Sequence, residues 1–280
     1  MAFYREVEPG ISRDYELRRE VCEKFPTQKA TIEIVPSKIH GSMLFIDGQL
    51  QLARKDEYIY HEMLIHPAIL AIEKKEDLRV CILGGGDGCA LREVLKWKQV
   101  AGVDLFDWDN VLVELFKTRY SDWNEKSLQD PRVSIHHIDV RKLAEEEFQY
   151  DIIIIDLLDP NCREKESVKL WQTLLEMSYS WIGKGGTMVL NAGAVYPWKT
   201  ETPTWLYSET MHAFRRSLDY ELCPYKVFVP SFATEWCFFL LKERGMELKW
   251  SDMPFKDSLN YLDPTTWLQA TMWPRNNRFA

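Results

Sequence analysis

The sequence predicts an α/β fold in which a doubly wound parallel sheet follows a small N-terminal antiparallel β domain. Its 280 residues suffice for one large domain or two modest ones. Short, nearly all-apolar runs alternate with segments of helical periodicity, a pattern typical of a parallel sheet covered on both faces by helices. The 46% hydrophobic and 28% charged fractions are those of a globular protein, which argues against disordered and fibrous architectures.

The charge balance argues against nucleic acid as a partner. Lys and Arg number 35 against 43 Asp and Glu, a formal net charge of −8, and an acidic surface repels phosphate backbones. The six cysteines form no CxxC pair and no metal-ligand spacing, so we expect reduced thiols and no metal. Neither a signal peptide nor a membrane span is predicted, and we therefore expect a cytoplasmic protein without membrane contact.

The N-terminal β domain is expected over residues 1–55. Two β-like runs, at residues 31–35 and 42–46, precede Asp47-Gly48, a dipeptide that favours tight hairpin turns. These runs predict a small antiparallel sheet ahead of the main domain.

The main domain is expected over residues 56–250, where strands and helices alternate. Helical periodicity covers residues 56–74, 89–98 and 111–120. Buried-strand runs cover residues 79–83, 103–106, 133–138, 151–155 and 186–190. Residues 251–280 contain three Pro and the aromatic residues Trp267, Trp273 and Phe279, and form a tail that either wraps the domain or contacts a partner.

Acidic residues mark the ends of the first four predicted strands, the edge at which parallel sheets bind ligands. The first strand runs into Gly84–Gly88, a GGGDG turn that lets backbone approach a nucleoside closely. Asp107 is placed to accept hydrogen bonds from both ribose hydroxyls, and Asp139 to accept one from the adenine amino group. The alternative makes these residues helix caps or turn residues. Their repeated placement favours a nucleoside site, formed by Gly84, Gly85, Gly86, Asp87, Asp107 and Asp139.

A carboxylate inside the glycine turn discriminates between nucleosides. Asp87 repels the pyrophosphate of a dinucleotide and attracts a cationic amine. Decarboxylated AdoMet has an ammonium and a sulfonium but no carboxylate, so it suits this turn better than NAD does. The expected sheet is therefore Rossmann-like in the manner of the AdoMet methyltransferases.

A further pair of carboxylates follows the fourth strand, in Asp156-Leu157-Leu158-Asp159-Pro160. Two such groups just beyond a buried strand can flank one cationic substrate, with one accepting a proton while the other anchors a distant amine. The alternative makes Asp156 a cap and Asp159-Pro160 a turn opener. The pair alone does not decide between the two interpretations.

Four separated segments resemble the polyamine aminopropyltransferases, the family of the spermidine, spermine and thermospermine synthases. They are RKDEYIYHEM at 54–63, GGGDG at 84–88, DLLDP at 156–160 and VPSFATEW at 229–236. Their order and spacing also agree with the family. The sequences YHE and PSF within these segments look most like those of the thermospermine synthases.

The resemblance implies a role for each residue of the pattern. Asp87 would bind the aminopropyl ammonium of the donor, and Asp156 would deprotonate the attacking amine together with the hydroxyl of Tyr60. Asp159 would anchor the far amine of the acceptor. The acceptor channel would be lined by Tyr60, His61, Phe232 and Trp236, whose aromatic rings suit a polymethylene chain and its charges.

The implied reaction moves the aminopropyl group of decarboxylated AdoMet to a polyamine and releases methylthioadenosine. No cofactor is implied, because the leaving group is a neutral thioether. The expected acceptor is spermidine, giving thermospermine or spermine, with putrescine as the alternative. The family also implies a homodimer.

Two other functions fit parts of the pattern. One is an AdoMet-dependent methyltransferase, against which the pair Asp156 and Asp159 argues. The other is a non-catalytic paralogue that binds nucleoside or polyamine and regulates a partner. Two departures from the family pattern allow the second alternative: Gln28 lies about two residues early for a ribose contact, and Asn191 stands where a Gln is usual.

Overall fold

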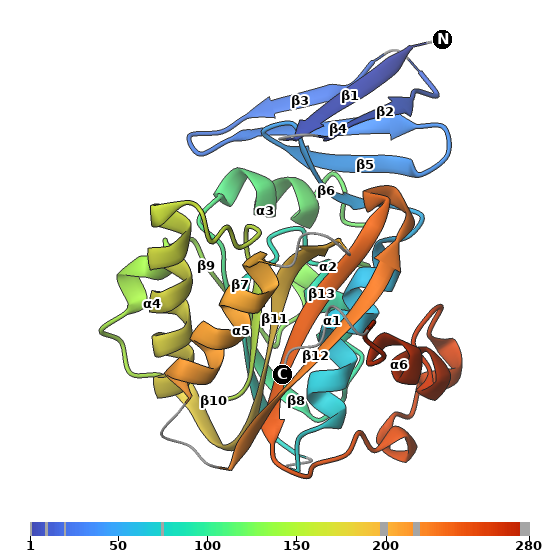
Figure 1. The fold of residues 1–280 in the computed structure, drawn as a ribbon. Coiled ribbons are helices and arrows are strands. Elements are labelled where there is room, and N and C mark those ends of the chain that lie inside the picture. Colours follow the sequence, from blue (N-terminus) through green and yellow to red (C-terminus); the bar gives the residue numbers. More distant parts are fainter. Residues whose placement is uncertain are drawn as a thin grey trace.

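The protein has three β-sheets in a computed structural model, which describes residues 2–8, 11–19, 21–73, 76–196, 201–214 and 219–274. A two-stranded and a four-stranded antiparallel sheet come first along the chain, followed by a seven-stranded mixed sheet. Figure 1 shows the two N-terminal sheets lying over one end of the large sheet, which has helices on both faces. The predicted fold class is therefore confirmed.

The N-terminal sheets are built from hairpins. Their strands are β1 (Phe3–Glu8), β2 (Ile11–Glu16), β3 (Glu23–Pro26), β4 (Thr31–Ser37), β5 (Gly41–Ile46) and β6 (Gln49–Ala53). Asp47 and Gly48 form the predicted turn between β5 and β6, and both have positive φ angles, of 49° and 77°. This left-handed backbone is what makes Asp-Gly a favourable turn sequence.

The large sheet has the strand order β12-β13-β11-β10-β7-β8-β9. Its parallel strands are the five that the apolar runs predict: β7 (Leu78–Gly84), β8 (Val100–Phe106), β9 (Val133–His136), β10 (Tyr150–Asp156) and β11 (Ile182–Val195). Two antiparallel strands that the sequence reading missed, β12 (Tyr220–Val229) and β13 (Thr234–Glu243), extend the sheet beyond β11.

Helices cover both faces of this sheet (Figure 1). They are α1 (Glu57–Leu70), α2 (Cys89–Leu95), α3 (Asn110–Lys117), α4 (Lys165–Trp181), α5 (Glu201–Ala213) and α6 (Pro264–Ala270). Short 3-10 turns occupy Ser127–Gln129, Val140–Leu143, Pro230–Phe232, Trp250–Asp252 and Lys256–Ser258. Among the described residues, none of the helices has both the length and the apolar character that crossing a membrane requires.

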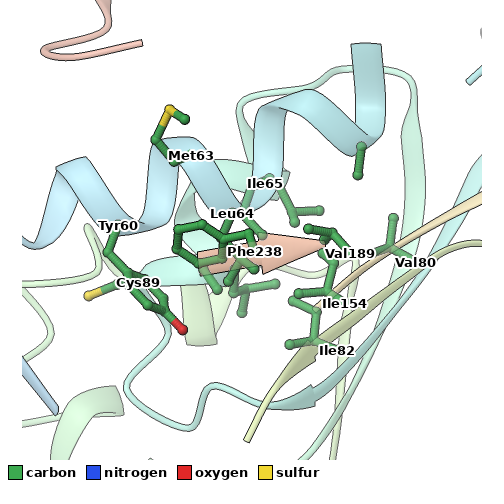
Figure 2. Close-up of a cluster of buried hydrophobic side chains, with 14 of the residues drawn as sticks. Tyr60, Met63, Leu64, Ile65, Val80, Ile82, Cys89, Ile154, Val189 and Phe238 are labelled. Carbon is green, nitrogen blue, oxygen red and sulfur yellow. The ribbon is translucent and has the colours of Figure 1, made fainter. Parts of the chain in front are cut away.

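Alternate residues of the central strands enter two separate cores. Ile82 and Ile154 point into the core that contains α1 and α2, whereas Leu83 and Ile155 point into the core that contains α4. Figure 2 shows the first core, where side chains of α1 lie against Val80, Ile82, Ile154 and Val189 of the strands. Tyr60 lies at one end of this cluster, so burial of α1 also positions a predicted site residue.

The tail packs against the main domain over its described part. The Glu62 carboxylate of α1 is fully buried and accepts hydrogen bonds from the backbone N–H groups of residues 260, 261 and 262, each at 2.9 Å. Trp267 packs on Tyr225 with ring centroids 4.8 Å apart, and Trp273 donates to the Pro224 carbonyl. Phe279 lies outside the described residues.

We predict that Glu62→Ala destabilises the protein by about 3 kcal/mol, because three backbone donors lose a charged acceptor in a buried setting. Urea unfolding followed by circular dichroism measures this. Glu247→Ala, at an exposed position just before the tail, is the matched control and should change the free energy of unfolding by less than about 0.5 kcal/mol. Equal effects of the two substitutions would contradict the role given to Glu62.

Candidate active site

The glycine turn and the DLLDP segment meet at the carboxyl ends of β7 and β10. Gly84 pairs with Asp156 across the ladder, and Gly85 N donates to the Asp156 carbonyl at 3.2 Å. Gly84 has a φ of +87°, and a Cβ there would overlap that carbonyl oxygen. A Cβ on Gly85 would lie 3.5 Å from Asp156 Oδ2. The absence of a side chain at Gly84 therefore lets the turn lie directly against the Asp156 backbone, and Gly85 lies beside the Asp156 carboxylate.

Asp107 holds the other side of the turn. Its Oδ2 accepts a hydrogen bond from Gly86 N at 3.0 Å, and its Oδ1 accepts one from Asp109 N at 2.9 Å. Burial raises the pKa of Asp107 to about 6, although both backbone donors favour the charged form. The carboxylate predicted to bind ribose is thus fixed against the glycine turn.

The three strand-end aspartates share one local geometry. Asp87, Asp107 and Asp139 each accept a hydrogen bond from the backbone N–H two residues later, at 2.8 to 3.0 Å. This is the turn role that the alternative interpretation gives them. It uses one oxygen of each carboxylate, so it orients the side chain and is compatible with ligand binding at the remaining lone pairs.

Asp139 is paired with a cation rather than with the other predicted site residues. Arg141 Nε lies 2.9 Å from Asp139 Oδ1, and Arg141 Nη2 lies 2.5 Å from Oδ2. The same guanidinium lies 5.9 Å from the ring centroid of Trp108, and the Lys29 ammonium lies 4.8 Å from it. An adenine amino group at Asp139 would therefore lie beside this ion pair, which the sequence pattern does not predict.

The N-terminal sheet reaches the same edge of the main domain. Thr27 Oγ1 donates to Asp109 Oδ2 at 2.8 Å, and Asp109 caps α3 by accepting from the N–H groups of residues 111 and 112. Gln28, in the same turn between β3 and β4, is exposed. The small domain thus contacts Asp109 and Trp108, which directly follow Asp107, through Thr27 and Lys29.

Asp156 is hydrogen-bonded by the phenol of Tyr60, with Tyr60 Oη donating to Asp156 Oδ1 at 2.7 Å. Burial raises the pKa of Asp156 to about 6, with the charge of Asp87 adding to the rise while His61 and the Tyr60 hydrogen bond oppose it. Burial and the Asp156 charge hold the Tyr60 pKa well above its usual range, so the phenol keeps its proton. A carboxylate with a pKa near neutrality is suited to accept a proton from an amine.

Aromatic rings form a wall beside this pair. The centroids of Phe232 and Trp236 are 4.7 Å apart, and those rings lie 6.3 and 6.5 Å from the Tyr60 ring. Phe232 ends the turn after β12, which is tied to the start of α1 where Ser231 N donates to Asp56 at 2.7 Å. The structure therefore brings all four predicted channel residues together. Phe232 and Trp236 lie beside Tyr60, and the His61 ring centroid lies 5.1 Å from that of Tyr60.

Asn191 connects the aromatic wall to the second carboxylate. Its Nδ2 donates to Asp159 Oδ1 at 3.0 Å, and its Oδ1 accepts from Trp236 Nε1 at 2.8 Å. Asp159 itself is exposed. Asn191 thus orients Asp159 and Trp236, two predicted site residues. From the sequence alone, Asn191 is identified only as a departure from the family pattern.

Glu57, His61 and Cys89 lie within 4.8 Å of one another, a grouping of residue types that can hold a metal ion. Both carboxylate oxygens of Glu57 accept hydrogen bonds from Arg92, each at 2.9 Å. The guanidinium already occupies both Glu57 oxygens and supplies the positive charge that a metal ion would bring. We therefore interpret this grouping as an ion-pair network.

Residues 57–251 match the Spermine/spermidine synthase domain. The chain belongs to this family. The match extends from the first residue of α1 to the beginning of the tail and includes the glycine turn, Asp156 and the aromatic wall. The family resemblance inferred from the four sequence segments is therefore confirmed.

Curated relatives of this family member are named polyamine aminopropyltransferases. The protein of Korarchaeum cryptofilum is 36% identical over 209 residues, which cover 74% of this chain and 61% of that protein. Polyamine aminopropyltransferase 2 of Pseudomonas aeruginosa is 31% identical over 230 residues, which cover 82% of this chain and 64% of that protein. The chain thus spans less than two thirds of the length of these relatives.

Solved spermidine synthases have the same fold as this family member. The enzyme from Thermotoga maritima gives a TM-score of 0.80 at 21% identity, over 98% of this chain and 91% of that one. A spermidine synthase in complex with the transition state analogue AdoDATO gives a TM-score of 0.82 at 21% identity, over 98% and 92%.

We predict that Gly84→Ala costs more than about 3 kcal/mol of stability, since the added methyl group overlaps the Asp156 backbone. Gly48→Ala is the matched control: its φ is +77°, but nothing lies within 4 Å of the added Cβ. That variant should lose only the 1–2 kcal/mol or so of left-handed backbone strain. Chemical denaturation compares the two, and equal losses would show that Gly84 is needed only for its φ angle.

Proposed function

We propose that the chain transfers the aminopropyl group of decarboxylated AdoMet to a polyamine and releases methylthioadenosine. The observation that carries this proposal is the half-buried Asp156 carboxylate, hydrogen-bonded by Tyr60 and lying beside the glycine turn. Family membership supports the same reaction class.

The donor is proposed to lie along the turn between β7 and α2. Asp107 accepts from the ribose hydroxyls, Asp139 from the adenine amino group, and Asp87 binds the aminopropyl ammonium. The half-buried Asp87 carboxylate precedes α2 and gives this part of the turn a negative charge. A donor with a carboxylate next to its amine would meet repulsion there.

The transfer step needs an uncharged amine nitrogen in line with the carbon next to sulfur. In the proposed mechanism Asp156 accepts a proton from the acceptor ammonium, and Tyr60 positions the carboxylate. The freed lone pair forms the new C–N bond while the C–S bond breaks and its electron pair goes to sulfur. The sulfonium thereby becomes a neutral thioether, and the proton leaves Asp156 to solvent. This chemistry calls for no cofactor or leaving-group acid.

The acceptor is proposed to extend along the wall formed by Phe232 and Trp236, with its far amine at Asp159. Apolar ring faces suit methylene chains, and rings also attract ammonium groups. Spermidine, giving thermospermine or spermine, is the acceptor that the YHE and PSF segments favour. Putrescine is the alternative, in which case the protein is a spermidine synthase.

We also propose that the enzyme is a cytoplasmic homodimer. Strands β3 and β6 are the outer strands of the four-stranded sheet, and open sheet edges are natural pairing surfaces. Size-exclusion chromatography with light scattering distinguishes a dimer from a monomer.

A product assay tests the proposed reaction. Purified protein is incubated with decarboxylated AdoMet and, separately, putrescine, cadaverine, agmatine, spermidine and spermine, and products are identified by chromatography with mass detection. Methylthioadenosine together with one preferred aminopropylated amine supports the proposal. Methylation with intact AdoMet would instead identify a methyltransferase, and nucleoside binding without product would favour the non-catalytic paralogue.

We predict that Asp156→Asn lowers turnover by roughly 10²- to 10⁴-fold, the range for loss of a general base. Affinity for methylthioadenosine, measured by calorimetry, should stay within about threefold of the parent value, since the amide keeps the size of the side chain. Asp257→Asn, at an exposed position of the tail, is the control and should leave turnover unchanged. Near-normal turnover of Asp156→Asn would remove this residue from the mechanism.

Activity is also expected to fall as the pH decreases through about 6. Burial raises the pKa of Asp156 to about 6, and below that value the carboxyl is protonated and cannot accept the amine proton. The acid limb of kcat/KM for the donor against pH reports this titration in the free enzyme. An acid limb near pH 4, the range of an ordinary exposed carboxyl, would contradict the assignment.

A further inference from the structure

A buried ion-pair network lies behind the proposed site, between α1 and α2. Glu57 and Arg92 are only 5% and 7% exposed, and the guanidinium contacts both carboxylate oxygens. Arg92 Nη1 also donates to the Trp123 carbonyl at 2.7 Å. The position and orientation of the Glu57 carboxylate are therefore fixed by a bidentate contact whose other side is anchored to backbone.

The same carboxylate holds His61. His61 Nδ1 lies 2.8 Å from Glu57 Oε2 and 2.8 Å from the Glu57 carbonyl oxygen. Two acceptors at one ring nitrogen require that this nitrogen carries a hydrogen. Among the described residues His61 Nε2, on the opposite edge of the ring, has no hydrogen-bond partner. The ring is 2% exposed and adjoins Tyr60.

Negative groups face His61 from three elements. Glu57 lies on its own helix, Asp87 lies in the turn before α2, and Asp156 ends β10. The Cys89 thiol of α2 adjoins the ring as well, and Asp159 acts on the neighbouring Tyr60. The Arg92 guanidinium reaches this group as the ion-pair partner of Glu57.

The balance of these effects favours a charged imidazole. Burial lowers the pKa of His61, but the hydrogen bond and charge of Glu57, followed by Asp87 and Asp156, raise it to about 9. The effect is mutual, since the charge of His61 lowers the Asp156 pKa and so opposes the rise that burial causes.

We propose that Glu57, clamped by Arg92, is a positioning residue that holds His61 as an imidazolium beside the carboxylates of the active site. The inference rests on the proposed function, because it concerns Asp156 as proton acceptor. Before a cationic substrate binds, the imidazolium supplies the positive charge that offsets Asp87 and Asp156. It thereby keeps Asp156 ionised and ready to accept a proton when the amine arrives.

The direct test is an NMR titration of the histidine ring protons in the free protein, with the His61 signal assigned from its absence in His61→Gln. In the parent protein His61 is expected to titrate near pH 9. In Glu57→Gln the anion is gone and burial dominates, so His61 is expected to titrate below its ordinary value of about 6.5. Unchanged titration in Glu57→Gln would overturn the proposal.

Glu93→Gln is the matched control. Glu93 is also buried and also contacts Arg92, which donates to it through Nε at 2.8 Å. Its other oxygen faces His66, at 3.0 Å, and not His61. The control therefore disturbs the same network but should leave the pKa of His61 unchanged. An equal shift of the His61 pKa in both variants would assign Glu57 a merely structural role.

Kinetics give the second readout. The acid limb of kcat/KM should move to higher pH by roughly one unit in Glu57→Gln, because Asp156 loses its neighbouring cation, and should not move in Glu93→Gln. If Glu57→Gln does not fold, the acid limb is measured in His61→Gln instead, because this variant removes the imidazolium and leaves the Glu57–Arg92 pair intact. An unmoved acid limb in His61→Gln overturns the proposal. Absence of aminopropyl transfer in the parent protein would refute the proposed function alone, because the NMR titration does not depend on turnover.

Discussion

At the end of strand β7 the backbone of Gly84 lies against the carbonyl of Asp156, and the rest of the site depends on this contact. A side chain at position 84 would force β7 and β10 apart. Because they stay together, the glycine turn, the Asp156 carboxylate and the Tyr60 phenol occupy one small volume at the edge of the sheet. The packing of α1 against the strands, shown in Figure 2, positions Tyr60 at the end of this core.

Burial of carboxylates at this edge sets the chemistry that the site can perform. Desolvation raises the pKa of Asp107 and of Asp156 to about 6. A cationic ligand that binds nearby stabilises the charged form of both carboxylates. A site for a sulfonium donor and an ammonium acceptor requires this property. The network of Glu57, Arg92 and His61 supplies positive charge from behind the same edge. Binding of the acceptor amine and the pH dependence of activity therefore both depend on the balance of charge between these carboxylates and the nearby cations.

The sequence predicts the parts of this architecture that repeat a simple physical pattern. The central strands β7 and β10 are nearly all apolar because both of their faces are buried, whereas the edge strand β9 is only partly buried. Each of the first four parallel strands is followed by an acidic residue at the ligand-binding edge. Strands β1, β2 and β3 escape prediction because charged residues interrupt them, as in the exposed pair Arg5–Asp14. The contacts of Glu57 with Arg92 and of Asp139 with Arg141 escape it as well. Helix periodicity shows which face is buried, but not which charged side chains pair within it.

The central claim is that the acidic turn after β7 selects a cationic donor that lacks a carboxylate. Calorimetric titration of the protein with decarboxylated AdoMet and with AdoMet compares two ligands that differ only in that group. The account predicts tighter binding of decarboxylated AdoMet by at least about tenfold, since one like-charge contact with Asp87 separates the two. Equal binding, or tighter binding of AdoMet, would contradict it.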